Sequence, residues 1–299
     1  MRQTINFALL IALLTALASS QLLASAIYRP FIMADPVNAR SVETAATEVQ
    51  AKLNQAGLEI VGQYSPFPGA IIIGVTSAEL KKISSQSRHG GFAAVMHVAI
   101  TATANGNGLE ISYTNPSYLG YAYQVGSLES FANQLEQALG NSGNFGSEEG
   151  ISANDLGNWR YMWGMPYFED AVTLEEFPSH EAAVESVANA LNNPESDMRS
   201  VWRVDVGGEQ TLFGVQLLRG YWSDNKLMSI MATLDTGGPK HTASLPWEIL
   251  VYKNSVVYLP GKYRIALVFP DLSMGTFMRI SDVPGQMDRS ANKLIDLAK

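Results

Sequence analysis

A repeated pattern constrains the fold of this 299-residue chain most strongly, because the second half repeats the order of the first. Each copy opens with an apolar helical stripe that follows a capping-type serine, Ser41 in one and Ser179 in the other. At a constant offset of 138 these segments share identical residues, namely Ser41/Ser179, Glu43/Glu181, Ala45/Ala183, Val49/Val187, Leu53/Leu191 and Asn54/Asn192. We therefore expect two similar units.

Later landmarks extend the repeat. Ile73-Gly74-Val75 matches Phe213-Gly214-Val215 at offset 140, inside β-branched runs that favour strands. Pro116 is matched with Pro270 at offset 154. The growth of the offset predicts about 14 additional residues in the second copy, which we place in the loop-like segment Leu234–Ser244.

Each copy is predicted to close with hairpins and a helix. Ala93–Ala104 and Leu109–Thr114 flank Asn105-Gly106-Asn107-Gly108, a strong hairpin signal. In the second copy, Glu248–Tyr252 and Val256–Leu259 flank a weaker turn. Helical stripes ending near Leu139 and Ala298 follow.

The run Tyr263–Phe269 is predicted as one more strand. Because the strands come in runs and do not alternate one by one with helices, the pattern indicates an α+β fold. We expect two similar domains, each an antiparallel curved sheet with helices packed on one face.

The second half resembles a bacterial family called domain of unknown function 302. The resemblance is carried by Trp247-Glu248-Ile249-Leu250-Val251-Tyr252 and by the run from Tyr263 to Met278. The first half, through the run from Gly108 to Pro116, is similar to a more divergent copy. The resemblance covers most of the chain beyond the N-terminal segment and implies a compact α+β unit with a curved antiparallel sheet. It implies no reaction and no catalytic residues.

The N-terminal segment has the order of a secretory signal peptide. Arg2 precedes an apolar run from Phe7 to Ala18, and small residues follow at Ala24-Ser25-Ala26. We predict a signal peptide over residues 1–26, with cleavage after Ala26 or, as the second choice, after Ser20. The alternative is an uncleaved anchor, because the 23 residues Ile5–Ile27 are long enough to span a bilayer. We expect a periplasmic protein with no stable membrane span after cleavage.

The predicted domains are residues 27–140 and 173–299, joined by an aromatic segment over residues 141–172. The aromatic segment is too rich in Trp, Tyr and Met to be a solvated linker. Its side chains are expected either to pack across both domains or to line a ligand cleft between them. The ligand-binding candidates in this segment are Trp159, Tyr161, Trp163 and Tyr167.

Arg264 is a further ligand-binding candidate. On a strand, it would share a face with Ala266 and Val268, and a guanidinium there requires a carboxylate partner. The partner is either Glu248 on a neighbouring strand or an anionic ligand, and we favour the internal ion pair.

Composition and motifs exclude several classes of activity. The chain has 20 Lys plus Arg against 28 Asp plus Glu, a net charge of −8, without a basic run for nucleic acid. It has no cysteine, which excludes thiolate catalysis and Cys-ligated metals. No two of its four histidines have the spacing of a helical zinc site, and nucleophile-elbow and phosphate-loop motifs are absent. We predict no catalytic residue, metal site or cofactor, a core or edge position for His97, and a solvated loop position for His241.

These observations favour a non-catalytic module of the bacterial cell envelope that binds a small molecule or an envelope protein. A hydrolase-type enzyme with dispersed residues is the first alternative, and a His close to a Ser or to a carboxylate in a pocket would mark it. A structural or assembly protein is the second, and a large exposed apolar patch together with the absence of an enclosed pocket would mark it.

Overall fold

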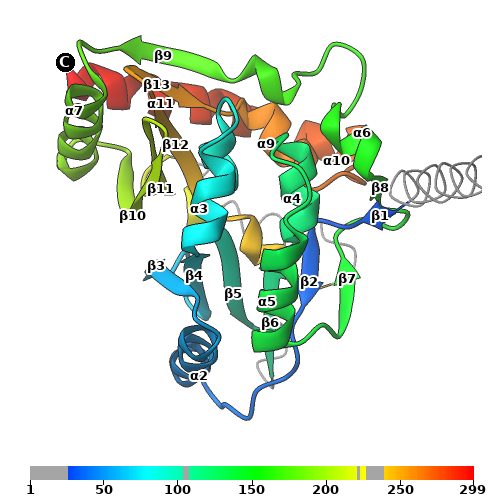
Figure 1. The fold of residues 1–299 in the computed structure, drawn as a ribbon. Helices are drawn as coiled ribbons and strands as arrows, with labels where there is room; N and C mark the ends of the chain where they lie inside the picture. Colours follow the sequence, from blue (N-terminus) through cyan, green and yellow to red (C-terminus); the bar gives the residue numbers. More distant parts are fainter. Residues whose placement is uncertain (1–25, 104–107, 221–222, 227–238) are drawn as a thin grey trace, which may run out of the picture.

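The computed structural model describes residues 26–103, 108–220, 223–226 and 239–299. Two large antiparallel sheets with helices around them make up the body of the molecule, which confirms the α+β class (Figure 1). A third, small sheet pairs β1 (Ile27–Tyr28) with β8 (Ile151–Ser152). The predicted signal peptide, apart from Ala26, and most of the predicted turn Asn105-Gly106-Asn107-Gly108 lie outside the described residues.

The first large sheet has six strands in the order β3-β4-β5-β6-β2-β7. Its strands are β2 (Phe31–Met33), β3 (Glu59–Tyr64), β4 (Ala70–Thr76), β5 (Met96–Ala102), β6 (Leu109–Thr114) and β7 (Gly143–Phe145). The helices of this half are α2 (Val42–Gln55), α3 (Ala78–Ser84), η1 (Gly90–Ala93), α4 (Pro116–Ala122) and α5 (Glu129–Leu139). Helix α2 begins where the Ser41 side chain accepts from Thr44 N, and its apolar face packs on β3, β4 and β5.

The second large sheet has five strands in the order β10-β11-β12-β13-β9. Its strands are β9 (Val172–Glu176), β10 (Met198–Gly207), β11 (Gln210–Leu217), β12 (Trp247–Tyr252) and β13 (Ser255–Tyr258). The helices of this half are α7 (His180–Asn192), η3 (Thr242–Ser244), α9 (Gly261–Val268), α10 (Met274–Arg279) and α11 (Asp282–Ala298). Between the halves lie α6 (Ala153–Gly157) and η2 (Phe168–Asp170).

The two sheets share one topology. Strands β3-β4-β5-β6-β2 and β10-β11-β12-β13-β9 stand in the same spatial order and in the same order along the chain. The order matches what an internal duplication predicts, and both predicted hairpins, β5–β6 and β12–β13, are confirmed. The buried side chains of both halves nevertheless form one continuous cluster among the described residues, so the domain boundaries stay a prediction.

Two details of the predicted repeat are wrong. The run Tyr263–Phe269 is not a strand, because residues Gly261–Val268 form helix α9. Helix α9 is buried on almost every side, and an apolar run buried all round has no periodicity that separates helix from strand. Pro116 is the first residue of α4, and the element at the same place in the second half begins at Gly261, not at Pro270.

The two halves make reciprocal contacts through their central helices. The 3-10 helix η1 contacts β11 and β12 of the other half, while η3 contacts β4, β5 and β6. Tyr118 of α4 donates to Leu267 O at 2.7 Å, and Tyr263 of α9 donates to Ala122 O at 3.0 Å. Each tyrosine is the third residue of its helix, so the two hydrogen bonds are equivalent.

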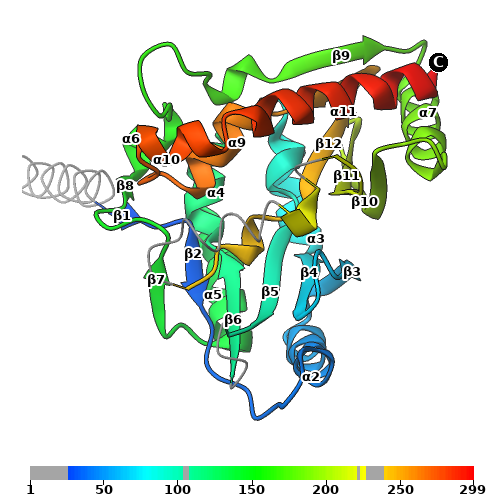
Figure 2. The same cartoon turned by 180° about the vertical axis from the view of Figure 1, so that it is seen from behind.

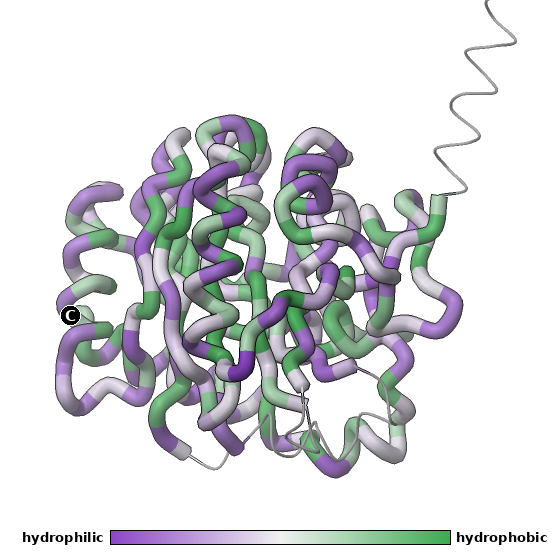
Figure 3. The backbone as a smooth tube through the Cα atoms, turned by 90° about the horizontal axis from the view of Figure 1, so that it is seen from below, coloured by the Kyte–Doolittle hydropathy of each residue, from purple (hydrophilic) through white to green (hydrophobic). Residues whose placement is uncertain are grey.

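Helices α2, α7 and α11 cover the outside of the molecule. Helix α2 lies at one end, and α7 and α11 lie at the other (Figures 1 and 2). Hydrophilic and hydrophobic residues alternate along the outer helices, as expected of helices with one buried face (Figure 3). Within the described part of the chain, no helix combines the length and the apolar character needed to cross a bilayer.

Candidate functional site

A buried cluster of polar side chains lies where the two halves meet. Arg264 Nη1 lies 2.6 Å from Glu248 Oε2, and Nη1 also donates to Tyr123 Oη at 3.0 Å. Its other terminal nitrogen, Nη2, donates to the carbonyl oxygens of Ser244 and Pro246. The internal ion pair predicted for Arg264 is therefore confirmed, although helix α9 and not a strand supplies the arginine.

His97 completes this cluster on the side of the first half. Its Nδ1 lies 3.2 Å from Ala243 O, and because a carbonyl only accepts, Nδ1 carries the proton. The other nitrogen, Nε2, faces Glu248 Oε1 at 3.5 Å and has no hydrogen-bond partner among the described residues. The prediction that His97 has a core or edge position is confirmed, since it is buried in β5.

The ionisation of the cluster follows from its burial. Burial raises the pKa of Tyr123 to about 12, even though the neighbouring Arg264 guanidinium acts to lower it. Burial alone would lower the pKa of Arg264, but Tyr123 and Glu248 outweigh it and raise the pKa above its ordinary value. The cluster thus holds a permanent cation, neutralised by Glu248.

The space beside this cluster is too small for a substrate. The cavity lined by His97, Glu248 and Arg264 has a volume of about 10 Å³, which corresponds to about one water molecule. A histidine beside a carboxylate was the expected mark of a dispersed hydrolase site. This pair meets the chemical criterion but gives an organic substrate no access, so we interpret it as a structural ion pair.

The aromatic segment packs across both halves through only some of its residues. Phe168 contacts the rings of Tyr123 and Tyr263 at centroid distances of 5.3 and 6.3 Å, and so touches both halves. Tyr161 donates a hydrogen bond to Leu272 O.

The remaining candidates of this segment differ in exposure. Trp159 is half-buried against the core, and Tyr167 lies under the Arg160 guanidinium at 5.0 Å. Trp163 is 87% exposed. None of the five predicted ligand-binding residues lines the open groove described below.

The prediction for His241 is wrong. The residue precedes η3 and lies among the rings of Phe31, Phe145 and Phe269, the last stacked on it at 4.5 Å. Burial lowers the pKa of His241 to about 4, so the ring is neutral at pH 7. A sequence position after Gly-Gly-Pro-Lys suggested a solvated loop, but aromatic neighbours from both halves enclose it.

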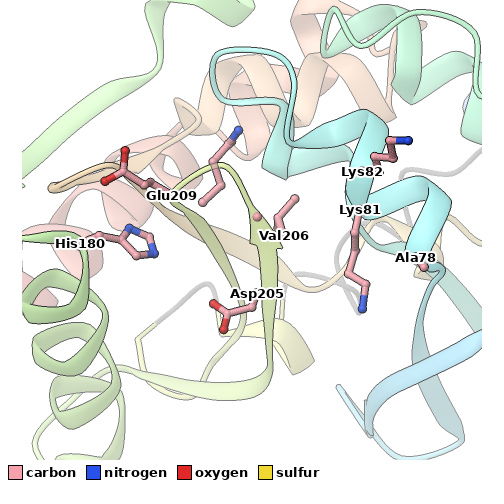
Figure 4. A pocket seen from close by; sticks show the side chains of 9 residues that line it. Ala78, Lys81, Lys82, His180, Asp205, Val206 and Glu209 are labelled. Carbon is pink, nitrogen blue, oxygen red and sulfur yellow. The ribbon is translucent and has the colours of Figure 1, made fainter.

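An open groove of about 560 Å³ lies between the halves on the outer surface. Three elements form it, namely α3 of the first half, the turn between β10 and β11, and the N-terminal end of α7 (Figure 4). The volume lies in the range of pockets that hold small molecules. The groove is lined by Ala78, Lys81, Lys82, His180, Asp205, Val206, Gly207, Glu209 and Gln210.

The two walls of the groove carry opposite charges. Lys81 and Lys82 project from α3, while Asp205 and Glu209 stand on the β10–β11 side (Figure 4). Lys81 Nζ also pairs with Glu59 Oε2 at 2.7 Å, which leaves Lys82 as the groove ammonium without an ion pair among the described residues. In Figure 4 the Lys82 side chain extends away from the β10–β11 side, so the groove offers a cationic wall opposite the anionic wall when this lysine side chain turns toward a bound molecule.

Hydrogen bonds hold the anionic wall in place. Thr211 donates to Asp205 Oδ1 at 2.7 Å, and His180 Nε2 lies 3.1 Å from the same threonine hydroxyl. His180 Nδ1 lies 2.7 Å from Lys253 O, so this carbonyl accepts from Nδ1–H. Thr211 is fully buried and cannot serve as a nucleophile for a molecule in the groove.

Gln210 joins the turn to α3. Its amide nitrogen donates to Ser85 O at 3.3 Å and Ser87 O at 3.1 Å, and its oxygen accepts from Gly91 N at 2.9 Å. Gly208 approaches closely, because a Cβ there would lie 2.8 Å from Ser85 O, and its φ is +58°. The two walls therefore come from different halves but form one fixed unit.

Sequence reasoning missed this groove. Its lysines and its carboxylates lie more than 120 positions apart, and neither set forms a recognised motif. The available signals are the Lys81-Lys82 pair at the end of a short helix and the Gly207-Gly208-Glu209 turn. Only knowledge of how the two halves dock, which places α3 against the β10–β11 hairpin of the other half, would have brought the lysines and the carboxylates together.

The described residues contain no group of three or more His, Asp or Glu side chains arranged to hold a metal ion. Comparisons with models of known protein families, with curated proteins and with solved structures find no match to this chain.

Proposed function

We propose that this protein is an exported binding protein of the bacterial cell envelope, without chemistry of its own, that takes a small zwitterionic ligand in the groove. An amino acid or a short peptide is the chemical class, because it carries a carboxylate and an ammonium on one small molecule. The single observation that supports the proposal most is the pairing of a lysine wall with a carboxylate wall in an open groove of suitable volume.

The charges favour a zwitterion over a simple anion. A ligand carboxylate would meet Lys82, and a ligand ammonium would meet Asp205 and Glu209. A simple anion would be attracted by one wall and repelled by the other. Ala78 and Val206 supply short apolar contacts between the charged groups, which suits a small side chain or a peptide backbone.

The remaining parts of the proposal come from the sequence. Export to the periplasm is inferred from the signal-peptide pattern of residues 1–26, and nucleic acid is excluded as a partner by the acidic balance. The resemblance to the domain of unknown function 302 family remains part of the proposal, as does the division into two such units.

Thermal unfolding with a panel of free amino acids and dipeptides tests the proposal. Ligand at a hundred times its Kd stabilises the folded state by about 2.7 kcal/mol. With an unfolding entropy of about 2.1 cal/mol/K per residue, that raises the Tm of a chain of this size by roughly 4–5 °C. We expect at least one zwitterion to give such a shift, and acetate or methylammonium alone to give none.

Charge-reversal variants of the two walls test whether the ligand binds between them. Lys82→Glu and Glu209→Lys are each expected to abolish the shift, whereas the double variant restores it, because a zwitterion can bind in the reversed direction. Lys52→Glu is the matched control, since Lys52 is a partly exposed lysine of α2 outside the groove. Equal shifts in Lys82→Glu and Lys52→Glu would place the ligand elsewhere.

A further inference from the structure

A second surface, distinct from the groove, carries exposed apolar side chains. We use the name apolar end for the surface formed by Ile27, Met162, Trp163, Met274 and Met278. Trp163 is 87% exposed, Met278 62% and Ile27 51%. Large apolar side chains gathered at one place mark a surface that contacts something other than water.

Trp163 is displayed by a tight turn. Met165 N donates to Met162 O at 3.0 Å, which closes a four-residue turn with Trp163 at its second position. Gly164, at the third position, has φ +81°, a value that glycine adopts without strain. The turn therefore holds the indole away from the body of the protein.

Helix α10 presents two methionines in the same way. Met274 and Met278 are four residues apart and so lie on one helical face. Helix α10 contains no buried residue, and Phe277 is the side chain that packs partly against the core. The two methionines thus form an exposed apolar strip on α10, next to the exposed Arg279 at its end.

The contributing segments are neighbours in space. Strand β1, which contains Ile27, pairs with β8, and β8 leads directly into α6 and then into the Trp163 turn. Tyr161 donates to Leu272 O, two residues before α10 begins. Elements β1, β8, α6 and α10 lie together at one end of the molecule in both views (Figures 1 and 2).

The chain itself indicates what this surface contacts. The apolar stretch Ile5–Ile27, long enough to span a bilayer, joins the described fold at β1, within the apolar end. The proposal that follows rests on the uncleaved alternative named above: retained as an anchor in a bilayer, this stretch would hold this end, and no other, at the lipid surface. Tryptophan is favoured at such an interface because its ring is amphipathic.

The charges near this surface select the kind of lipid. Four exposed acidic side chains lie there, Glu148, Glu149, Asp155 and Asp271, against one exposed base, Arg279, and two partly exposed ones, Arg29 and Arg160. Anionic headgroups would be repelled. We propose that the apolar end is a membrane-contact surface that rests on zwitterionic lipid, with Trp163, Met274 and Met278 inserted at the interface.

Quenching of tryptophan fluorescence by brominated lipid tests this proposal. The full chain is reconstituted into vesicles of phosphatidylcholine brominated on its acyl chains. We expect quenching in the wild-type protein, loss of the larger part of it in Trp163→Phe, and little loss in the control Trp159→Phe. Met274→Ser combined with Met278→Ser is expected to weaken quenching while Trp163 is retained.

Three outcomes distinguish zwitterionic lipid from other molecules that this surface could contact. Replacing half of the lipid by brominated phosphatidylglycerol is expected to reduce the quenching of Trp163. Equal quenching in wild type and Trp163→Phe would overturn the proposal. A shift of Trp163 emission that depends on protein concentration and not on lipid would also overturn it, in favour of contact with a second copy.

Discussion

Replacing Glu248 by Gln removes the only negative charge that contacts the buried Arg264 guanidinium among the described residues. The guanidinium would keep Tyr123 Oη and the carbonyl oxygens of Ser244 and Pro246, but no counter-charge. Breaking a buried ion pair by removing one partner costs about 3–5 kcal/mol. This is a large fraction of the roughly 5–15 kcal/mol that stabilises a typical protein.

Denaturant titration measures this cost as a change in the free energy of unfolding, and a thermal scan should show a loss on the order of 10 °C in Tm. Glu48→Gln is the matched control, because Glu48 forms a partly exposed surface pair with Lys52 and its loss costs about 0–1 kcal/mol. Replacing both partners, Glu248→Leu with Arg264→Met, should recover most of the stability. If Glu248→Gln costs no more than Glu48→Gln, the central role of the pair is refuted.

Two further predictions concern the core. Burial raises the pKa of Asp224 to about 7, although its hydrogen bonds from Leu217 N and Tyr64 act to lower it. Because the unfolded carboxyl has a pKa near ~3.9, only the folded state holds the proton between about pH 4 and 7, so stability falls as pH rises through that window. Asp224→Asn should flatten this fall in Tm, and an unchanged slope would contradict the assignment. A Cβ at position 214 would lie 2.3 Å from the Trp202 indole, so Gly214→Ala should lower the free energy of unfolding by about 1–3 kcal/mol in a denaturant titration. Gly157→Ala is the control and should be nearly neutral, because a Cβ there would meet open space. Equal effects of the two substitutions would count against this packing.

The sequence predicted those elements whose patterns are local. Helices α2 and α7 are confirmed because Ser41 and Ser179 cap them and their apolar residues recur at helical spacing. Hairpin β5–β6 is confirmed because two β-branched runs flank a turn signal. These signals depend on neighbouring residues and need no knowledge of tertiary contacts.

The errors arose where tertiary contacts decide the outcome. Helix α9 is buried on nearly all sides, so its apolar run gave no period, and a strand was predicted in its place. Glu248 follows Gly214 by 34 positions and His97 follows Gly74 by 23, so the excess between these paired positions is 11 residues and not about 14. Part of the segment Leu234–Ser244, where the excess was placed, lies outside the described residues. The figure of 14 came from pairing Pro116 with Pro270, and that pairing is wrong because α4 corresponds to α9, which begins at Gly261.

The candidate site was predictable only in part. The Arg264–Glu248 pair followed from the need of a guanidinium in apolar surroundings for a carboxylate. The groove did not follow, because Lys82 and Glu209 belong to different halves and meet only when η1 and the β10–β11 turn dock. A site built between two repeats leaves no contiguous motif.

Hydrogen exchange of the full chain, with and without the zwitterion that gives the largest thermal shift, tests the central claim most directly. Ligand held between the two walls should slow exchange in residues 78–84 and 205–210 together, because each wall supplies one side of the site. Protection confined to residues 159–168, or to one wall alone, would contradict a ligand site between the halves.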